Sequence, residues 1–222
     1  MREQDIFKGI KACIFDLDGT LVDSMKVWAK VDRQFFLSKG MTIPKDYQKA
    51  IAHMTLMENA RYTVERFGFS ETPEELIAIW MGFAKAEYAF NIKAKSHAKE
   101  LLSLLKQKGY HIALATSNSS DLYLPCLENN GLLPYFDFLQ NAEALNTNKK
   151  EPKIYLALSE KMGAEAKETL VFEDILTAIK TAHNAGFRTV CVKDESSRKD
   201  LPIIETLADL VIEDFQSIVD VV

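Results

Sequence analysis

The stretch Ala12-Cys13-Ile14-Phe15-Asp16-Leu17-Asp18-Gly19-Thr20 decides how the rest of the chain is interpreted. A run of apolar residues too short for a globular helix leads directly into two aspartates that stand two positions apart. Side chains with this spacing at a strand end point to the same side, and Gly19 lets the backbone turn tightly after them. The pattern predicts a buried strand that brings two carboxylates and a hydroxyl to one point. Because an isolated Asp-Gly pair is also common in simple turns, the surrounding sequence has to decide between the two interpretations.

Short apolar runs recur further along the chain and predict more buried parallel strands. They lie at Ile112 to Ala115, Leu170 to Phe172, Thr189 to Val192 and Leu210 to Ile212. Helical patterns separate them: one runs from Ala98 to Leu105 before Gly109, and another closes at Gly186. Strands that alternate with crossover helices indicate an α/β fold with a doubly wound parallel sheet, in which a functional site lies at the carboxyl ends of the strands.

Residues 23–95 interrupt this alternation, since they are rich in helix formers and aromatic residues and contain no convincing strand. Thr72 followed by Pro73, Glu74 and Glu75 is typical of a helix start, with an N-cap, a proline in the first turn and acidic residues near the helix N-terminus. We therefore expect a helical insertion at 23–95 in a catalytic core made of 1–22 and 96–222.

Composition excludes several classes of protein. The 222 residues are 47% hydrophobic, which is ample for a globular core, and the 27 basic against 32 acidic residues give a net charge of −5. A mildly acidic chain lacks the basic surface expected of a nucleic-acid-binding protein, so we expect no nucleic acid partner. No apolar run is long enough for a membrane span and the first residues do not resemble a signal peptide, which favours a cytoplasmic protein without membrane contact.

Cysteine and histidine show no metal-binding pattern. Cys13, Cys126 and Cys191 are too far apart in sequence for a disulfide framework or a structural zinc site, and we expect them to pack as small apolar residues. The histidines lack ligand spacing, and we expect structural or surface positions for all of them. They are His53, His97, His111 and His183.

Four motifs, in order along the chain, resemble those of the haloacid dehalogenase-like superfamily of phosphatases and phosphomutases. The segments that carry the resemblance are Phe15 to Ser24, Ala113 to Asn118, Lys149 to Tyr155, and Val171 to Asp174. The resemblance spans about Ile10 to Phe215, and four ordered motifs at strand ends are far more specific than any one of them. It implies a Rossmann-like core with a helical cap domain inserted after the first motif.

The resemblance also implies catalytic roles for the two aspartates of the first motif. Asp16 is expected to be the nucleophile that forms an aspartyl-phosphate, because an ionised carboxylate can attack phosphorus without a base. Asp18 is expected to be the general acid and base, with a pKa above the free value of about 3.9. Asp16, Asp174 and the backbone carbonyl of Asp18 are expected to hold Mg²⁺, while Glu173 either joins them or supports them.

Phosphate is expected to bind to Lys149, the Thr116 hydroxyl and the Ser117 amide. Relatives usually have a proline after the motif lysine and an aspartate before the pair that corresponds to Ile154 and Tyr155. Here Lys150 and Lys153 stand in those places and are alternatives for the phosphate-binding lysine. Further candidates for substrate binding are Gly19, Thr20 and Asn118.

The expected reaction is hydrolysis of a small phosphomonoester, such as a sugar phosphate. The alternative within the family is a phosphosugar mutase of the β-phosphoglucomutase type, but Trp28 and Leu56 stand where those enzymes carry a histidine and an arginine. Dehalogenation is disfavoured because that branch lacks the second aspartate, which Asp18 supplies here. A non-catalytic phospholigand-binding protein is the alternative from another class, and the oligomeric state stays open.

Overall fold

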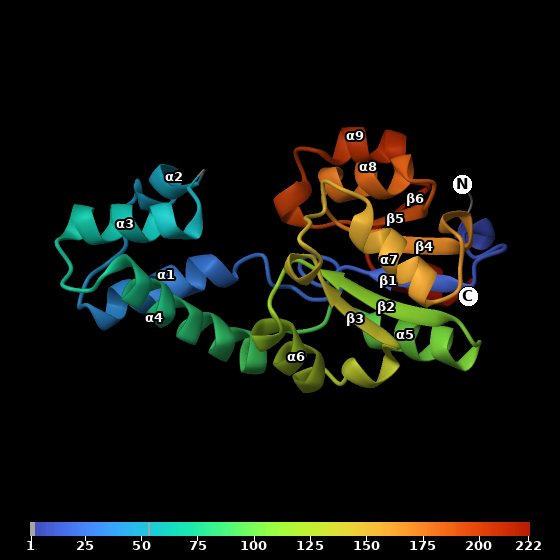
Figure 1. The fold of residues 1–222 in the computed structure, drawn as a ribbon, viewed down its shortest axis with the longest axis horizontal. Helices are drawn as coiled ribbons and strands as arrows, with labels where there is room; N and C mark the ends of the chain where they lie inside the picture. Colours follow the sequence, from blue (N-terminus) through green and yellow to red (C-terminus); the bar gives the residue numbers. More distant parts are fainter. Residues whose placement is uncertain (1–2, 53) are drawn as a thin grey trace. The chain divides into compact units, whose positions relative to one another are not determined.

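The computed structural model describes residues 3–52 and 54–222, so His53 lies outside the described residues. The chain forms two compact units, one made of Met1–Met25 with Ile92–Val222 and the other of Lys26–Asn91 (Figure 1). None of the described helices combines the length and the apolar character needed to cross a membrane.

The larger unit contains a parallel six-stranded sheet in the order β3-β2-β1-β4-β5-β6, which confirms the doubly wound α/β fold. The strands are β1 Ala12–Phe15, β2 His111–Thr116, β3 Phe138–Asn141, β4 Thr169–Glu173, β5 Arg188–Val192 and β6 Leu210–Ile212. Every residue of β1 and β4 is buried, which explains why their sequences show apolar runs rather than alternation. The apolar runs of the sequence did not predict β3, a half-buried strand at the edge of the sheet.

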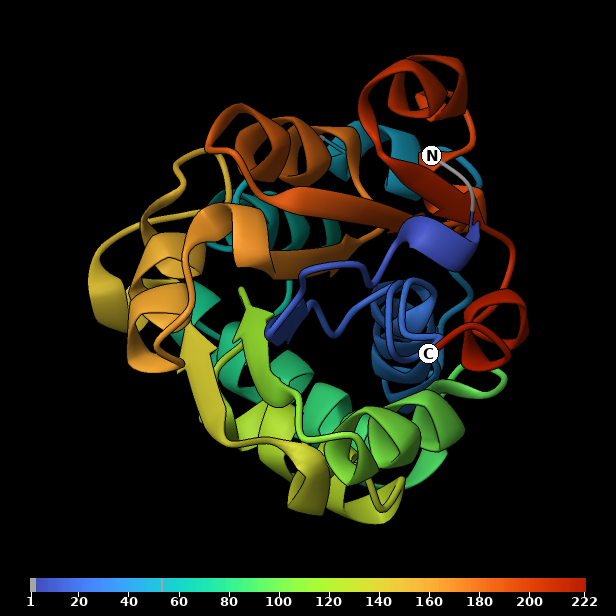
Figure 2. The same ribbon diagram turned by 90° about the vertical axis from the view of Figure 1, so that its right-hand side faces the viewer.

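Helices cover both faces of the sheet (Figures 1 and 2). They are α5 Ala98–Gln107, α6 Ser120–Asn129, α7 Lys153–Lys161, α8 Leu176–Asn184, α9 Leu201–Leu207 and α10 Gln216–Val219. On one face, side chains of α7 and α8 pack on Ile14, Ala113 and Val171 in a single core cluster. Phe15 and Phe172 are register partners on neighbouring strands, and their stacked rings are 4.2 Å apart. This central packing holds the ends of β1 and β4 side by side.

The smaller unit is helical. Its helices are α1 Val27–Ser38, α2 Tyr47–Ile51, α3 Leu56–Phe67 and α4 Pro73–Ala86, followed by a π-helical turn at Glu87–Asn91. As expected, Thr72 caps α4, and its side chain and that of Glu75 satisfy each other's backbone amides in a capping box. Aromatic rings from α1 to α4 form a core of their own, with centroids between 5.0 and 6.4 Å apart. Its role as a cap stays a prediction.

The three cysteines are buried and free, as expected. Of the described histidines, His111 and His183 are exposed and His97 is half-buried at the N-cap of α5. His97 has a φ of 60°, a left-handed backbone conformation that residues other than glycine rarely adopt.

Replacing His97 by Gly is expected to stabilise the chain by about 0.5–1 kcal/mol, because relief of the left-handed strain outweighs the extra entropy of an unfolded glycine. Asn146, with a φ of 48°, offers a matched control. The short polar side chain of asparagine can hydrogen-bond locally in this conformation, so Asn146→Gly is expected to gain less. Urea unfolding measures both free energies, and an His97→Gly variant no more stable than the parent would contradict the assignment of strain.

Candidate active site

The candidate site lies where β1 and β4 end. Asp16 follows the last residue of β1, while Glu173 ends β4 and Asp174 follows it. The amide of Asp16 donates a hydrogen bond to the Phe172 carbonyl at 3.0 Å, which extends the pairing of the two strands up to the acidic residues. One carboxylate oxygen of each acid lies within 4.8 Å of the others, and all three side chains are buried. The topology thus creates an acidic cluster at the carboxyl edge of the sheet, where doubly wound folds bind ligands.

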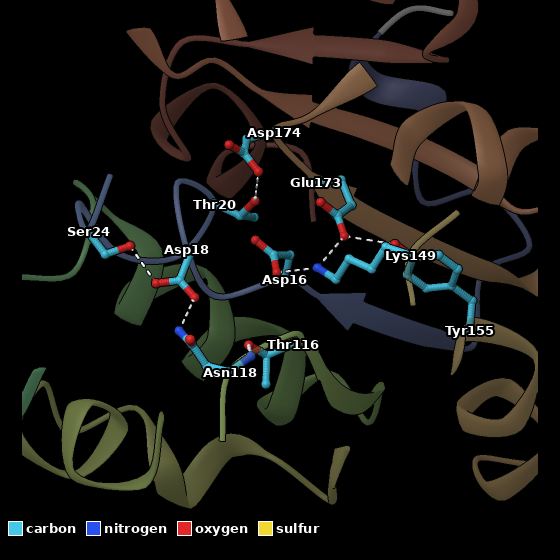
Figure 3. Close-up of polar contacts among 10 residues, drawn as sticks. All are labelled: Asp16, Asp18, Thr20, Ser24, Thr116, Asn118, Lys149, Tyr155, Glu173 and Asp174. Atoms are coloured by element: carbon cyan, nitrogen blue, oxygen red, sulfur yellow. Dashed lines mark hydrogen bonds and ion pairs between the residues drawn. The ribbon is translucent and has the colours of Figure 1, made fainter. Parts of the chain in front are cut away.

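Lys149 approaches this cluster from the loop before α7 (Figure 3). Its Nζ donates to Oδ1 of Asp16, and to Oε1 of Glu173 at 2.6 Å. Burial lowers the pKa of Lys149, but the charges of Asp16 and Glu173 outweigh burial and hold that pKa above its ordinary value. Of the alternative lysines, Lys150 is exposed and Lys153 donates to the Leu145 carbonyl. The structure therefore brings Lys149, and neither of the other two, to the acids.

The acidic cluster carries more negative than positive charge. Three carboxylates face the single ammonium of Lys149, and burial with charge repulsion raises the pKa of Asp174. Burial also raises the pKa of Glu173, although Lys149 opposes the shift. Oε2 of Glu173 and Oδ2 of Asp174 are buried and find no hydrogen-bond donor within the described part of the chain. Buried oxygens that lack a donor are the ligands that a hard dication prefers, so these residues fit Mg²⁺.

Gly19 and Thr20 lie against Asp174. Gly19 has a φ of 80°, and a Cβ at this position would collide with the Asp174 carboxylate, 2.9 Å from its Cγ. The hydroxyl of Thr20 donates a long hydrogen bond of 3.4 Å to Oδ1 of Asp174. The tight turn expected at Gly19 therefore allows the first motif to pass close to an acid from the other end of the chain. Substrate binding by these two residues stays a prediction.

The Asp18 carboxylate is turned toward Ser24 and Asn118 rather than toward Asp16 (Figure 3). Oδ1 accepts a hydrogen bond from the Ser24 hydroxyl at 2.6 Å, and Oδ2 accepts one from the Asn118 side-chain amide at 2.5 Å. Both donors hold the carboxylate in this orientation. The acid and base role expected of Asp18 stays a prediction.

The second motif lies at the end of β2, the other neighbour of β1. Thr116 is the last residue of β2 and is fully buried, whereas Ser117 is exposed. The backbone amide of Asn118 donates to Oγ1 of Thr116 at 3.0 Å. Asn118 therefore connects the hydroxyl expected to bind phosphate with the carboxylate of Asp18. Substrate binding by Asn118 stays a prediction.

Two polar residues at the site were not singled out from the sequence. Ser24 closes the first motif, and its spacing from Asp18 gives no periodic signal because the intervening backbone forms an irregular turn. Tyr155 belongs to the third motif, and its hydroxyl donates to Oε1 of Glu173 at 2.8 Å. A tyrosine beside an apolar run looks like a core residue in sequence, so only the structure could show this contact.

The sequence is similar to those of known proteins. A profile of the family described as "Haloacid dehalogenase-like hydrolase" matches residues 13–192. The chain is 25% identical to the "Phosphorylated carbohydrates phosphatase" of Thermotoga maritima over 82% of this chain and 84% of the relative. It is 28% identical to a phosphoglycolate phosphatase of Agrobacterium fabrum over 92% of this chain and 89% of the relative.

Solved structures share the fold. The crystal structure of a Thermotoga maritima protein described as a "putative beta-phosphoglucomutase" superimposes with a TM-score of 0.82. The two sequences are 23% identical, and the similarity covers 94% of this chain and 97% of that protein. At this level of identity, the likeness supports the fold and not a particular reaction.

Proposed function

The chain belongs to the haloacid dehalogenase-like hydrolases, and from this premise we propose that it is a Mg²⁺-dependent phosphatase that hydrolyses a small phosphomonoester through a covalent intermediate on Asp16. The observation that carries the proposal is the convergence of Asp16, Glu173 and Asp174 with Lys149 at the ends of two adjacent strands. Two relatives named as phosphatases of phosphorylated carbohydrates and of phosphoglycolate support this class of substrate.

The proposed reaction has two chemical steps. In the first, an oxygen of Asp16 forms a bond to phosphorus, the bond between phosphorus and the substrate oxygen breaks, and Asp18 gives its proton to that oxygen. In the second, Asp18 removes a proton from water, whose oxygen attacks phosphorus and releases inorganic phosphate from Asp16. Asp18 ends the cycle protonated, and Asp16 is again a carboxylate.

The groups around Asp16 are proposed to bind and orient the phosphate. Lys149 stays protonated and supplies the positive charge, while Thr116 and the Ser117 amide supply hydrogen-bond donors. The Asp18 carboxylate points away from Asp16 in this arrangement. It therefore has to break its hydrogen bonds with Ser24 and Asn118 to reach the oxygen of the leaving group. A rotation of this side chain is therefore part of the proposal.

Asp16, Asp174, the Asp18 carbonyl and Glu173 are the residues that we propose to hold Mg²⁺. When bound, the ion would neutralise the excess negative charge and so lower the repulsion between Asp16 and a phosphate dianion. The unpartnered oxygens of Glu173 and Asp174 support this assignment.

Hydrolysis is favoured over phosphate transfer within a sugar. Trp28 and Leu56 belong to the helical unit, for which we propose a cap function over the substrate. Neither side chain can carry the charge that would help to hold a second phosphate group. We therefore propose a small metabolite with one phosphate, such as a sugar phosphate, as the substrate.

Phosphate release from p-nitrophenyl phosphate, and then from a panel of phosphorylated metabolites, tests the proposed function. We expect turnover with Mg²⁺ and its loss when the ion is removed with a chelator, because the acids then repel the phosphate. Restored activity after Mg²⁺ is returned is the control for damage by the chelator. If no substrate releases phosphate although phosphate or its esters bind, the non-catalytic phospholigand-binding alternative is supported instead.

A further inference from the structure

The proposed reaction assigns no role to the hydroxyl of Tyr155, which contacts the acidic cluster at Glu173. We infer that Tyr155 is a positioning residue that orients Glu173, so that one carboxylate oxygen is held by donors and the other stays available to a cation. This inference rests on the proposed function, because it assumes that the acidic cluster binds Mg²⁺.

Glu173 has two oxygens in different environments. Oε1 accepts from both Lys149 at 2.6 Å and Tyr155 at 2.8 Å, whereas Oε2 is buried without a donor in the described part of the chain. Figure 3 shows the two donors reaching the same oxygen. Two donors on one oxygen restrict the rotation of the carboxylate about its terminal bond, and this rotation determines where Oε2 lies.

The surroundings of Tyr155 make it a rigid donor. The ring is fully buried in α7 and belongs to the core cluster that joins α7 to β1, β2 and β4. It also contacts the Phe187 ring edge to face, with centroids 6.1 Å apart. Because the ring is fixed by core packing, its hydroxyl has one direction in which to donate, and Glu173 lies there.

Lys149 alone does not provide the same constraint. Its ammonium is shared between Glu173 and Asp16, and an ammonium on a flexible stem acts as a point charge with little directional preference. If phosphate drew Lys149 toward itself, Tyr155 would be the donor left on Oε1 of Glu173. The tyrosine is therefore suited to keep Glu173 in place while Lys149 binds the phosphate of the substrate.

Replacing Tyr155 by Phe tests this role, since the ring stays and only the hydroxyl is lost. Residues that orient metal ligands typically contribute about 10- to 100-fold to metal affinity, and because Lys149 remains as one donor we expect a loss of about tenfold in the affinity for Mg²⁺. Isothermal titration of the metal-free full chain with Mg²⁺ measures this without any substrate. An affinity within twofold of the parent would overturn the inference, as would a variant that fails to fold, because a folding role would then explain the contact.

Tyr47 provides a matched control. It is buried in the helical unit, and its hydroxyl lies 2.8 Å from the Thr63 hydroxyl and donates to Oδ1 of Asn59 at 3.1 Å, so Tyr47→Phe also removes the contacts of a buried hydroxyl. We expect Tyr47→Phe to bind Mg²⁺ with the affinity of the parent. An equal loss in both variants would assign the effect to general destabilisation and overturn the inference.

A double-mutant cycle tests whether Tyr155 acts through Glu173. In a Glu173→Ala background, Tyr155→Phe is expected to change the affinity for Mn²⁺, measured by electron paramagnetic resonance, by less than twofold. A further tenfold loss in that background would show a route independent of Glu173 and contradict the inference. If the parent's affinity for Mg²⁺ depends on Tyr155 but the parent releases no phosphate, only the proposed function is refuted.

Discussion

Asp16→Asn is expected to abolish phosphate release, with a loss on the order of 10⁵-fold or more, while the chain remains folded. An amide oxygen is a far weaker nucleophile than a carboxylate, so the bond to phosphorus does not form. The fold should survive because Lys149 keeps its contact with Glu173 at 2.6 Å and is not left as an uncompensated buried charge. The substitution also removes one of three carboxylates crowded around a single ammonium.

Steady-state release of phosphate from p-nitrophenyl phosphate measures the loss, and far-UV circular dichroism with thermal unfolding checks the fold. Asp220→Asn is the matched control, since Asp220 is exposed near the chain end and the same chemical change there should leave the rate unaltered. Activity of Asp16→Asn within tenfold of the parent would remove Asp16 from the role of nucleophile.

The central strands were predictable because burial on both faces favours a continuous apolar run. This applies to β1 and β4, whose residues are all buried. The edge strand β3 was not predictable in the same way. Its residues Phe138, Leu139, Gln140 and Asn141 are all half-buried, and it pairs only with β2. A short mixed sequence of this kind has no apolar run and no alternation, so only pairing with its neighbour defines it.

The position of the site followed from strand order, but its hydrogen bonds did not. Acids that follow neighbouring parallel strands must meet at one edge, which is why Asp16 and Asp174 could be expected together. The contact of Asn118 with Asp18 depends on side-chain rotamers in an irregular loop, and the contact of Tyr155 with Glu173 depends on how α7 packs. Neither contact produces a periodic pattern in the sequence. The catalytic roles of these residues stay predictions, as does the division at 22 and 96 between core and cap.

Asp18→Asn is expected to slow the release of phosphate from Asp16 by about 10²- to 10⁴-fold, since an amide cannot take a proton from the attacking water. With p-nitrophenyl phosphate the first step is largely spared, because p-nitrophenolate leaves without a proton. Phosphate should therefore accumulate on Asp16. With an alkyl phosphate the leaving oxygen needs the proton as well, so both steps slow and less intermediate accumulates. This difference between leaving groups is the signature of a residue that acts as acid and then as base.

Intact-protein mass spectrometry after brief exposure to p-nitrophenyl phosphate and Mg²⁺ measures the trapped phosphate, and a rapid burst of p-nitrophenolate should match it in amount. The Asp16→Asn, Asp18→Asn double variant controls for phosphate at another position, because it retains the asparagine at 18 but lacks the nucleophile. The asparagine can still accept from the Ser24 hydroxyl, whose bond to Asp18 is 2.6 Å, so a folded variant is expected. If neither a burst nor bound phosphate is seen while turnover is slowed, Asp18 does not act in the second step, and its hydrogen bonds with Ser24 and Asn118 would then describe a structural residue.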